Sequence, residues 1–270
     1  MTPGGRNART PVGLILAAGR GTRLRPFTSS IPKCLVVVGR HPIVAYQVSS
    51  FIAHGIFEII VVIGYRAAQV RRYLEREFPT VRFQFVENQE FASTNTLVST
   101  HLALGAVTSD ILQVNGDILY HPDILGVLMQ ERERRHLAAC IGVQRRLCGK
   151  EEVKVAIGRA GHVTAITKLI EPDAAIGEAI GVNWFSNEFL NSFMTAATEL
   201  LATGRRDYYY EAAIERVIEH EPGTVGIADL TDLAAIEIDF PEDLAYAETA
   251  VYPRIAAAYA MLPIPRRRLT

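Results

Sequence analysis

The sequence LAAGRGTRLRP spans residues 16–26, and Pro32 and Lys33 follow a few positions later. It continues directly from VGLIL at residues 12–16, a short apolar run typical of a buried strand. Glycines at such a strand end let backbone N–H groups approach an anion closely and form a nest for it. Arg23 and Lys33 add positive charge, the arginine as a planar fork and the lysine as a point charge. The segment therefore predicts a phosphate-binding loop after the first strand of an α/β sheet.

Two common phosphate-binding fingerprints do not fit this loop. It lacks the Walker A pattern GxxxxGK[ST], and the dinucleotide pattern GxGxxG fails because Leu24 takes the place of the third glycine. The loop therefore indicates neither a P-loop ATPase nor a dehydrogenase.

The whole string resembles the signature of the nucleotidyltransferases that activate sugar 1-phosphates and phosphocholine, which reads LAAGxGTRL followed by P, T and PK. Every element is present, namely Thr22, Arg23, Pro26, Thr28, Pro32 and Lys33. The resemblance extends over about residues 12–250 and is closest to the bacterial CTP:phosphocholine cytidylyltransferases. It implies a Rossmann-like, doubly wound, mostly parallel sheet of the nucleotide-diphospho-sugar transferase fold. The nucleotide-binding residues that it implies in the loop are Leu16, Ala17, Ala18, Gly19, Gly21, Thr22, Arg23 and Lys33.

The rest of the first half alternates between strand and helix patterns. Apolar runs at 59–63, 81–86 and 111–114 predict strands, while a helical repeat begins after Pro42 and a polar-faced helix covers 67–77. This alternation predicts a doubly wound α/β fold, in which ligands bind at the carboxyl ends of the strands.

From about Leu137 the chain is predicted to be richer in strands, at 137–143, 153–157, 163–167 and 179–185, with helices at about 208–220 and after Pro241. The expected nucleotidyltransferase domain spans 12–250. It is divided into a nucleotide-binding part at 12–136 and a strand-rich acceptor-binding part at 137–240, with a disordered leader at 1–11 and a C-terminal helix or tail at 251–270.

The composition is that of an ordinary globular chain, since 49% of its 270 residues are hydrophobic and 21% are charged. A formal net charge of -1 gives no electrostatic signal for nucleic acid, and no apolar stretch is long enough to cross a bilayer. Cys34, Cys140 and Cys148 lack both metal-ligand spacing and the even count of a disulfide framework, so a reducing compartment, the cytoplasm, is expected. The oligomeric state stays open, a homo-oligomer included.

Two aspartates are candidates for binding a divalent metal. Nucleotidyl transfer brings two anions together, so it needs a cation such as Mg²⁺, which prefers hard oxygen ligands. Asp117 ends a predicted strand, and the resemblance implies that it binds the metal, although the pattern alone also fits a turn aspartate. Asp239 stands in a segment similar to the family's closing motif, and its alternative role is an N-cap ahead of Pro241. With Arg23 and Lys33, these aspartates form the predicted catalytic set.

A polar stretch at 87–97 is the predicted site of the base, because the phosphocholine branch has a similar N-x-x-(F/Y)-x-x-x-N segment there. Its candidate residues are Asn88, Ser93 and Asn95. Ser93 or Thr94 also fits an N-cap of the following helix.

The acceptor-binding motif differs from that of the enzymes acting on hexose 1-phosphates. Those enzymes typically carry Glu-Lys-Pro, whereas this chain has Thr167, Lys168 and Leu169. Lys168 carries over as a contact to the acceptor phosphate, but the missing carboxylate removes one reason to expect a hexose.

Aromatic and acidic residues in two further segments resemble the phosphocholine branch. They are Glu178 and Trp184 in one segment, and Tyr209, Tyr210 and Glu211 in the other. Aromatic faces bind a quaternary ammonium through cation–π contacts, and carboxylates add complementary charge. Because Trp184 lies in a predicted strand and Tyr210 on the apolar stripe of its helix, both also fit the core.

The first hypothesis is a Mg²⁺-dependent enzyme that transfers CMP from CTP to a phosphorylated amino alcohol such as phosphocholine and releases pyrophosphate. A sugar or cyclitol 1-phosphate, or aminoethylphosphonate, is the alternative acceptor. A non-catalytic nucleotide-binding regulatory domain is the third hypothesis, and the presence of Arg23, Lys33, Asp117 and Asp239 disfavours it.

Overall fold

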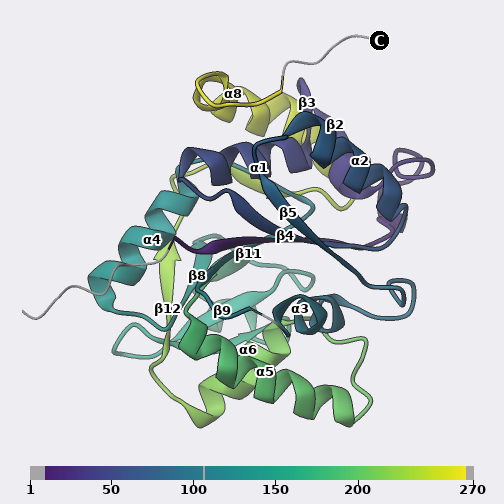
Figure 1. Cartoon of the computed structure of the whole chain (residues 1–270). Helices are drawn as coiled ribbons and strands as arrows, with labels where there is room; N and C mark the ends of the chain where they lie inside the picture. Colours follow the sequence, from purple (N-terminus) through teal and green to yellow (C-terminus); the bar gives the residue numbers. More distant parts are fainter. Residues whose placement is uncertain (1–9, 106, 266–270) are drawn as a thin grey trace, which may run out of the picture.

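A sheet of nine strands forms the centre of the computed structural model, which describes residues 10–105 and 107–265 (Figure 1). The strand order is β10, β9, β11, β6, β1, β4 and β5, and β8 pairs with both β11 and β12. These strands are β1 (Val12–Ala17), β4 (Glu58–Ile63), β5 (Arg82–Glu87), β6 (Ile111–Asn115), β8 (Ala139–Gln144), β9 (Lys154–Ile157), β10 (Val163–Thr167), β11 (Gly177–Phe185) and β12 (Val225–Asp229). Two small ribbons pair β2 (Val37–Val38) with β3 (His41–Pro42), and β7 (Ile118–Tyr120) with β13 (Ala235–Glu237).

The part of the sheet around β1 is parallel. β1 pairs with β4 on one side and with β6 on the other, and β4 pairs with β5. Most residues of β1, β4 and β6 are buried, which is typical of strands covered on both faces. β11 runs antiparallel to β6 and continues the sheet towards β8 and β9. The predicted doubly wound, mostly parallel sheet is confirmed, and the predicted strand-rich segment extends the same sheet.

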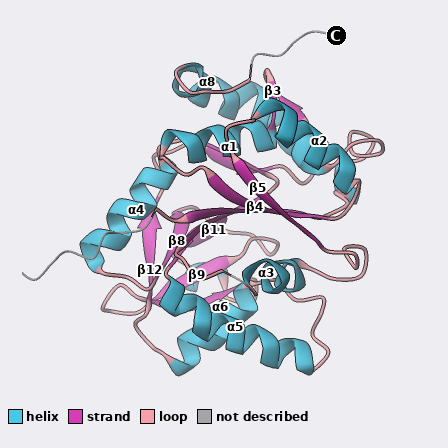
Figure 2. Ribbon diagram, viewed as in Figure 1, coloured by secondary structure: helices cyan, strands magenta, loops and turns pink. Residues whose placement is uncertain are grey.

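Helices cover both faces of this sheet (Figures 1 and 2). Ile15, Val61 and Val114 pack in one core with α1, α2 and α4, whereas Leu14 and Ile60 pack in another with α3, α5 and α6. Successive strand residues point to opposite faces, so each strand contributes to both cores. The helices are α1 (Ile43–Ala53), α2 (Ala67–Glu77), α3 (Thr96–Leu104), α4 (Ile124–Arg135), α5 (Asn187–Ala202) and α6 (Glu211–His220). Within the described ranges, no helix has the length and apolar character that crossing a membrane requires.

The predicted strands all occur in the structure. Those expected at 12–16, 59–63, 81–86 and 111–114 are β1, β4, β5 and β6, and the four later ones are β8 to β11. The helix expected at about 208–220 begins at Glu211. The helix expected to follow Ser93 and Thr94 is α3, whereas α4 and α5 were not predicted. The predicted leader at 1–11 lies outside the described residues except for its last two, and the predicted tail is described only to residue 265.

The C-terminal helices α7 (Pro241–Tyr246) and α8 (Tyr252–Ala260) are joined by a π-helical turn at Ala247–Val251. The ring of Tyr252 lies over Gly39, between β2 and β3, so closely that a Cβ on Gly39 would have no room. The Gly39 N–H also donates to Glu248 Oε1 at 2.9 Å. Because this ribbon follows the 3₁₀ turn Lys33–Leu35, the C-terminal segment helps to fix the position of Lys33.

Gly116 lies where the chain leaving β6 approaches β1, and its N–H donates to the Leu16 carbonyl at 2.9 Å. A Cβ on Gly116 would lie 2.6 Å from that oxygen. We therefore expect Gly116→Ala to lower the free energy of unfolding by about 1–3 kcal/mol, measured by urea denaturation. Gly105→Ala is the control, because a Cβ there would meet nothing closer than 4.0 Å. Equal losses in both variants would contradict the close-approach explanation.

Candidate functional site

The loop after β1 is held by contacts within its own segment. Gly21 has a φ of 58°, in the left-handed region that favours glycine. The Thr28 hydroxyl donates to the Gly21 carbonyl at 2.6 Å, and Leu24 is fully buried at the end of a 3₁₀ turn, Thr22–Leu24. Arg23, in the same turn, keeps about half of its side chain exposed (49%) and lines the cleft described below.

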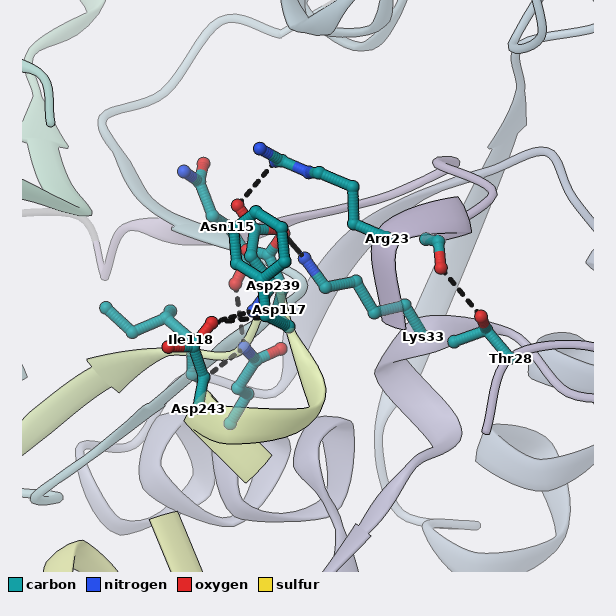
Figure 3. Close-up of polar contacts among 11 residues, drawn as sticks. Arg23, Thr28, Lys33, Asn115, Asp117, Ile118, Asp239 and Asp243 are labelled. Atoms are coloured by element: carbon teal, nitrogen blue, oxygen red, sulfur yellow. Dashed lines mark hydrogen bonds and ion pairs between the residues drawn. The ribbon is translucent and has the colours of Figure 1, made fainter. Parts of the chain in front are cut away.

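Lys33 lies between the two predicted metal-binding aspartates (Figure 3). Its Nζ donates to Asp117 Oδ2 at 2.7 Å and also forms an ion pair with Asp239 Oδ1. Arg23 Nη2 donates to Asp239 Oδ2 at 2.5 Å. Burial lowers the pKa of Lys33, but the charges and hydrogen bonds of the two aspartates outweigh it and hold that pKa above its ordinary value. The structure thus brings the four predicted catalytic side chains into one ionic cluster.

Backbone pairing places the two aspartates side by side. Asp117 follows β6, which lies next to β1 in the sheet. The Asp117 carbonyl accepts a hydrogen bond from the Ile238 N–H at 3.1 Å, just beyond the antiparallel pairing of β7 with β13. Asp239 is the next residue and so reaches the same ammonium as Asp117.

Asp243, rather than Asp239, caps the start of α7. Its carboxylate accepts hydrogen bonds from the N–H groups of Asp239, at 2.9 Å, and Phe240, at 2.7 Å. The alternative prediction of Asp239 as an N-cap is therefore wrong, and the Asp239 carboxylate is left to bind Lys33 and Arg23.

Glu237 is a third carboxylate of this cluster. It was not predicted as a site residue from the sequence. One oxygen from each of Asp117, Glu237 and Asp239 lies within 4.8 Å of the others. The negative charge of Asp117, together with desolvation and Asp239, raises the pKa of Glu237 to about 8, while Lys33 opposes the shift. The signal was available, because two residues spaced by two in an extended segment share a side.

The three carboxylates fit a hard divalent cation, which prefers oxygen ligands. Asp117 Oδ1 is buried and has no hydrogen-bond partner within the described part of the chain, so a ligand atom is available beside the one that Lys33 binds. Asp117, Asp239 and Glu237 are therefore the residues that would hold such a metal.

A cleft of about 830 Å³ extends from this cluster to the predicted acceptor residues. Its predicted nucleotide-binding lining comprises Leu16, Gly19, Gly21, Thr22, Arg23, Lys33 and Asn95. Its predicted acceptor-binding lining comprises Lys168, Glu178, Tyr209, Tyr210 and Glu211. Residues from both halves of the sequence thus face one space.

Charged side chains at the acceptor end are paired with one another. The Lys168 ammonium lies 5.1 Å from the centre of the Tyr209 ring and 3.7 Å from Glu151. Glu178, which is largely buried, forms an ion pair with Arg146.

Glu211 differs from these pairs, because its Oε2 is buried and lacks a hydrogen-bond partner within the described residues. Burial raises the pKa of its carboxyl to about 7. The preceding residue, Tyr210, lines the cleft but is 1% exposed, and its hydroxyl accepts a hydrogen bond from Asn183 Nδ2 at 2.9 Å. Tyr210 therefore serves the core as well as the cleft wall.

Trp184 does not line the cleft, so its prediction as an acceptor-binding residue is corrected. It is 3% exposed and packs in the core beneath α4, where the Arg132 guanidinium lies 4.3 Å from the ring centre. The alternation of β11 turns Trp184 to that face and turns Asn183 towards Tyr210 on the other.

The three predicted base-binding residues have different surroundings in the structure. Asn88 is buried, and its amide is bonded to Thr94, Ser99 and the Glu90 N–H, so it holds its own loop together and is corrected to a structural residue. Ser93 is exposed and does not line the cleft.

Asn95 does line the cleft, and it is also the N-cap of α3 through the Thr96 N–H at 2.8 Å. The alternative placement of that cap on Ser93 or Thr94 is wrong. Ala17 and Ala18 are buried at the end of β1 and do not line the cleft, so their role in nucleotide binding stays a prediction.

Comparison with protein-family models matches residues 12–149 to the nucleotidyl transferase family. The chain belongs to this family. The matched residues contain the loop, Lys33 and Asp117, whereas Asp239 and most of the acceptor end follow them in the sequence.

Two curated relatives of this nucleotidyl transferase family member have names that refer to a CMP-linked product or to cytidylyl transfer. It is 26% identical over 249 residues to CMP-5'-(3-aminopropyl)phosphonate synthase of Streptomyces rubellomurinus, covering 89% of this chain and 38% of that protein. It is 42% identical over 89 residues to choline-phosphate cytidylyltransferase of Streptococcus pneumoniae, covering 33% of this chain and 37% of that protein. Each alignment thus covers less than half the length of the relative.

The fold of the inositol-1-phosphate CTP transferase from T. maritima is similar to that of this family member, with a TM-score of 0.77 and 21% identity. The alignment covers 93% of this chain and 96% of that one. It therefore includes the acceptor end, which the family model does not reach, and it shows that the nucleotidyltransferase fold extends over nearly the whole chain.

The raised pKa of Glu211 predicts a specific pH dependence of stability. The folded chain holds this proton more tightly than the unfolded chain, so stability should fall as the pH rises from the ordinary value of 4.5 through about 7. Glu211→Gln should remove this contribution to the pH dependence. Between pH 4.5 and pH 8, its free energy of unfolding relative to the wild type should rise by up to about 3 kcal/mol, measured by urea unfolding. Glu219→Gln, at an exposed site on the same helix, should follow the wild-type profile. A Glu211→Gln profile parallel to the wild type would contradict the assignment.

Proposed function

We propose that this chain is a Mg²⁺-dependent nucleotidyltransferase that joins CMP from CTP to a phosphorylated acceptor and releases pyrophosphate. The observation that carries the proposal is the cluster of Lys33, Arg23 and two aspartates beside a loop with the family signature, at one end of a large cleft. The proposed nucleotide-binding part at 12–136 and acceptor-binding part at 137–240 both contribute residues to the lining of that cleft. A cytoplasmic location stays a prediction from the sequence.

The reaction needs no nucleophile from the protein. An oxygen of the acceptor phosphate or phosphonate attacks the α-phosphorus of the nucleotide, and the bond to the pyrophosphate oxygen breaks, so that pyrophosphate leaves with the electron pair. Arg23 and Lys33 are placed to bind the phosphates and to neutralise the negative charge that develops on them. Asp117 and Asp239, with Glu237 beside them, would hold Mg²⁺, which supplies charge neutralisation when bound.

The choice of CTP rests on the names of the relatives. One of the two curated relatives described above is named a cytidylyltransferase and the other a synthase of a CMP-linked phosphonate. Leu16, Gly19 and Gly21 line the cleft beside the loop where the nucleotide is expected, and Asn95 lines the same cleft. Backbone N–H groups of the loop suit phosphate oxygens, and the Asn95 amide suits a base.

The acceptor end favours a molecule that carries both a phosphate or phosphonate and an ammonium. Lys168 and Arg146 offer positive charge to the anionic group. Glu178 offers negative charge to the cationic one, and so does Glu211 once a bound ammonium lowers its raised pKa. A primary ammonium can donate a hydrogen bond to the unpartnered oxygen of Glu211, whereas a trimethylammonium cannot. We therefore place aminoalkyl phosphonates and phosphoethanolamine ahead of phosphocholine, and sugar or cyclitol phosphates after both.

Pyrophosphate release tests this proposal directly. The assay combines Mg²⁺ and each of four nucleoside triphosphates with aminoethylphosphonate, phosphoethanolamine, phosphocholine, glucose 1-phosphate or inositol 1-phosphate. We expect turnover with CTP and the ammonium-bearing acceptors. Turnover only with a sugar or inositol phosphate would contradict the acceptor assignment. A lack of turnover throughout would count against the proposed reaction itself.

Lys33→Ala should lower kcat/KM by about 10²–10³-fold, because it removes a buried cation from the reacting phosphates. The folded state should persist, as judged by circular dichroism. Lys150→Ala, at an exposed site outside the cleft lining, should retain wild-type turnover. Wild-type rates in Lys33→Ala would remove Lys33 from the catalytic set.

Glu211→Gln should raise the KM for a primary-ammonium acceptor by about tenfold while leaving the KM for CTP unchanged, because it removes a carboxylate charge from the acceptor end only. Trp184→Phe is the matched control, since Trp184 is buried away from the cleft, so that variant should lower thermal stability alone. A raised acceptor KM in Trp184→Phe with no change in Glu211→Gln would reverse the two assignments.

A further inference from the structure

The Lys33 ammonium lies between the two aspartates and is bound to both of them. Only 11% of its side chain is exposed, and it contacts one oxygen of each carboxylate. Arg23 binds the second oxygen of Asp239. Of the four oxygens on Asp117 and Asp239, only Asp117 Oδ1 therefore lacks a partner within the described residues.

This arrangement sets Lys33 against any other cation that would use the same oxygens. The ammonium Nζ lies 2.7 Å from Asp117 Oδ2, so a divalent ion bound to both carboxylates would lie within a few ångströms of it. Like charges at that distance repel strongly in a partly buried site. A divalent ion that binds both carboxylates therefore competes with the Lys33 ammonium for them.

The stem of the Lys33 side chain lies beside the phosphate loop. A Cβ on Gly21 would lie 3.0 Å from Lys33 Cβ. A lysine carries its charge on four flexible carbons, so the ammonium can turn towards an anion bound at the loop while the stem stays in place. Both the anionic and the carboxylate partners of Lys33 are thus within reach of one anchored stem.

We propose that Lys33 is the internal counter-ion of the Asp117–Asp239 pair, and that the nucleotide phosphates must draw its ammonium away before both carboxylates become available to a divalent cation. The second part rests on the proposed function. Metal binding is then weak in the absence of nucleotide, and the nucleotide and its metal enter the site together. Lys33 serves both as a phosphate ligand and as the group that makes metal binding depend on nucleotide.

Titration of the protein with MnCl₂ in the absence of nucleotide tests the proposal, with free Mn²⁺ measured by electron paramagnetic resonance. We expect weak binding by the wild type and binding at least about tenfold tighter in Lys33→Met, which keeps an unbranched side chain of nearly the same length and removes its charge. Lys33→Gln is the second variant in case the methionine variant is unstable. Lys168→Met is the control, because it removes a lysine from the same cleft that contacts neither aspartate. Adding Asp117→Asn to Lys33→Met should abolish the gain, which locates the ion at this pair.

Equal Mn²⁺ affinity in the wild type and in a folded Lys33 variant would overturn the proposal. Tight Mn²⁺ binding by the wild-type protein in the absence of nucleotide would also overturn it. The outcome is independent of the proposed reaction, because the titration contains neither nucleotide nor acceptor. An inactive enzyme whose Lys33 variant gains affinity would mean that the reaction is wrongly assigned while the counter-ion is correct. If the wild-type enzyme is active but its Lys33 variant binds Mn²⁺ no more tightly, the reaction is correctly assigned and the counter-ion role is wrong.

Discussion

The close approach of Asp117 and Asp239 is the constraint on which the site depends. Two carboxylates so near one another repel when both are ionised, and a cation between them offsets that repulsion. Lys33 supplies that cation from a third segment, which the β2–β3 ribbon and the C-terminal helices hold in place. The order of strands, with β6 beside β1, and the pairing of β7 with β13 are what bring these distant residues together.

The strands could be predicted because burial on both faces leaves continuous apolar runs such as 12–16 and 59–63. The helices were predicted less completely. Only the start of α3 was expected, because this helix buries consecutive residues, polar Ser99 and Thr100 among them, and has no clear amphipathic stripe. α5 does have such a stripe, and its N-cap is Ser186, whose hydroxyl accepts a hydrogen bond from the Phe189 N–H. Its helical pattern was not recognised, because the preceding segments have strand patterns.

The site could be predicted where a motif fixes the residue and not where tertiary packing decides its role. Lys33, Asp117 and Asp239 follow from signature positions and meet as expected. Trp184 and Asn88 do not face the cleft, because strand alternation and the internal hydrogen bonds of a loop turn them away, and neither effect is visible in composition. Glu237 was missed although its spacing from Asp239 was informative, because a lone glutamate in a short strand carries no signature of its own.

The same principle of internal pairing governs the far end of the cleft. Arg146 is bound to Glu178, and Lys168 lies near Glu151 and over Tyr209, so an incoming anion exchanges one partner for another rather than adding a new interaction. The net gain from each charge is then small. An anion that draws Arg146 away from Glu178 without supplying a cation leaves this largely buried carboxylate unpaired, which is costly. On the proposed function, such a cleft would select acceptors that carry both charges at the correct separation. Specificity would then depend on the distance between the anionic and cationic groups of the acceptor more than on the affinity of either group.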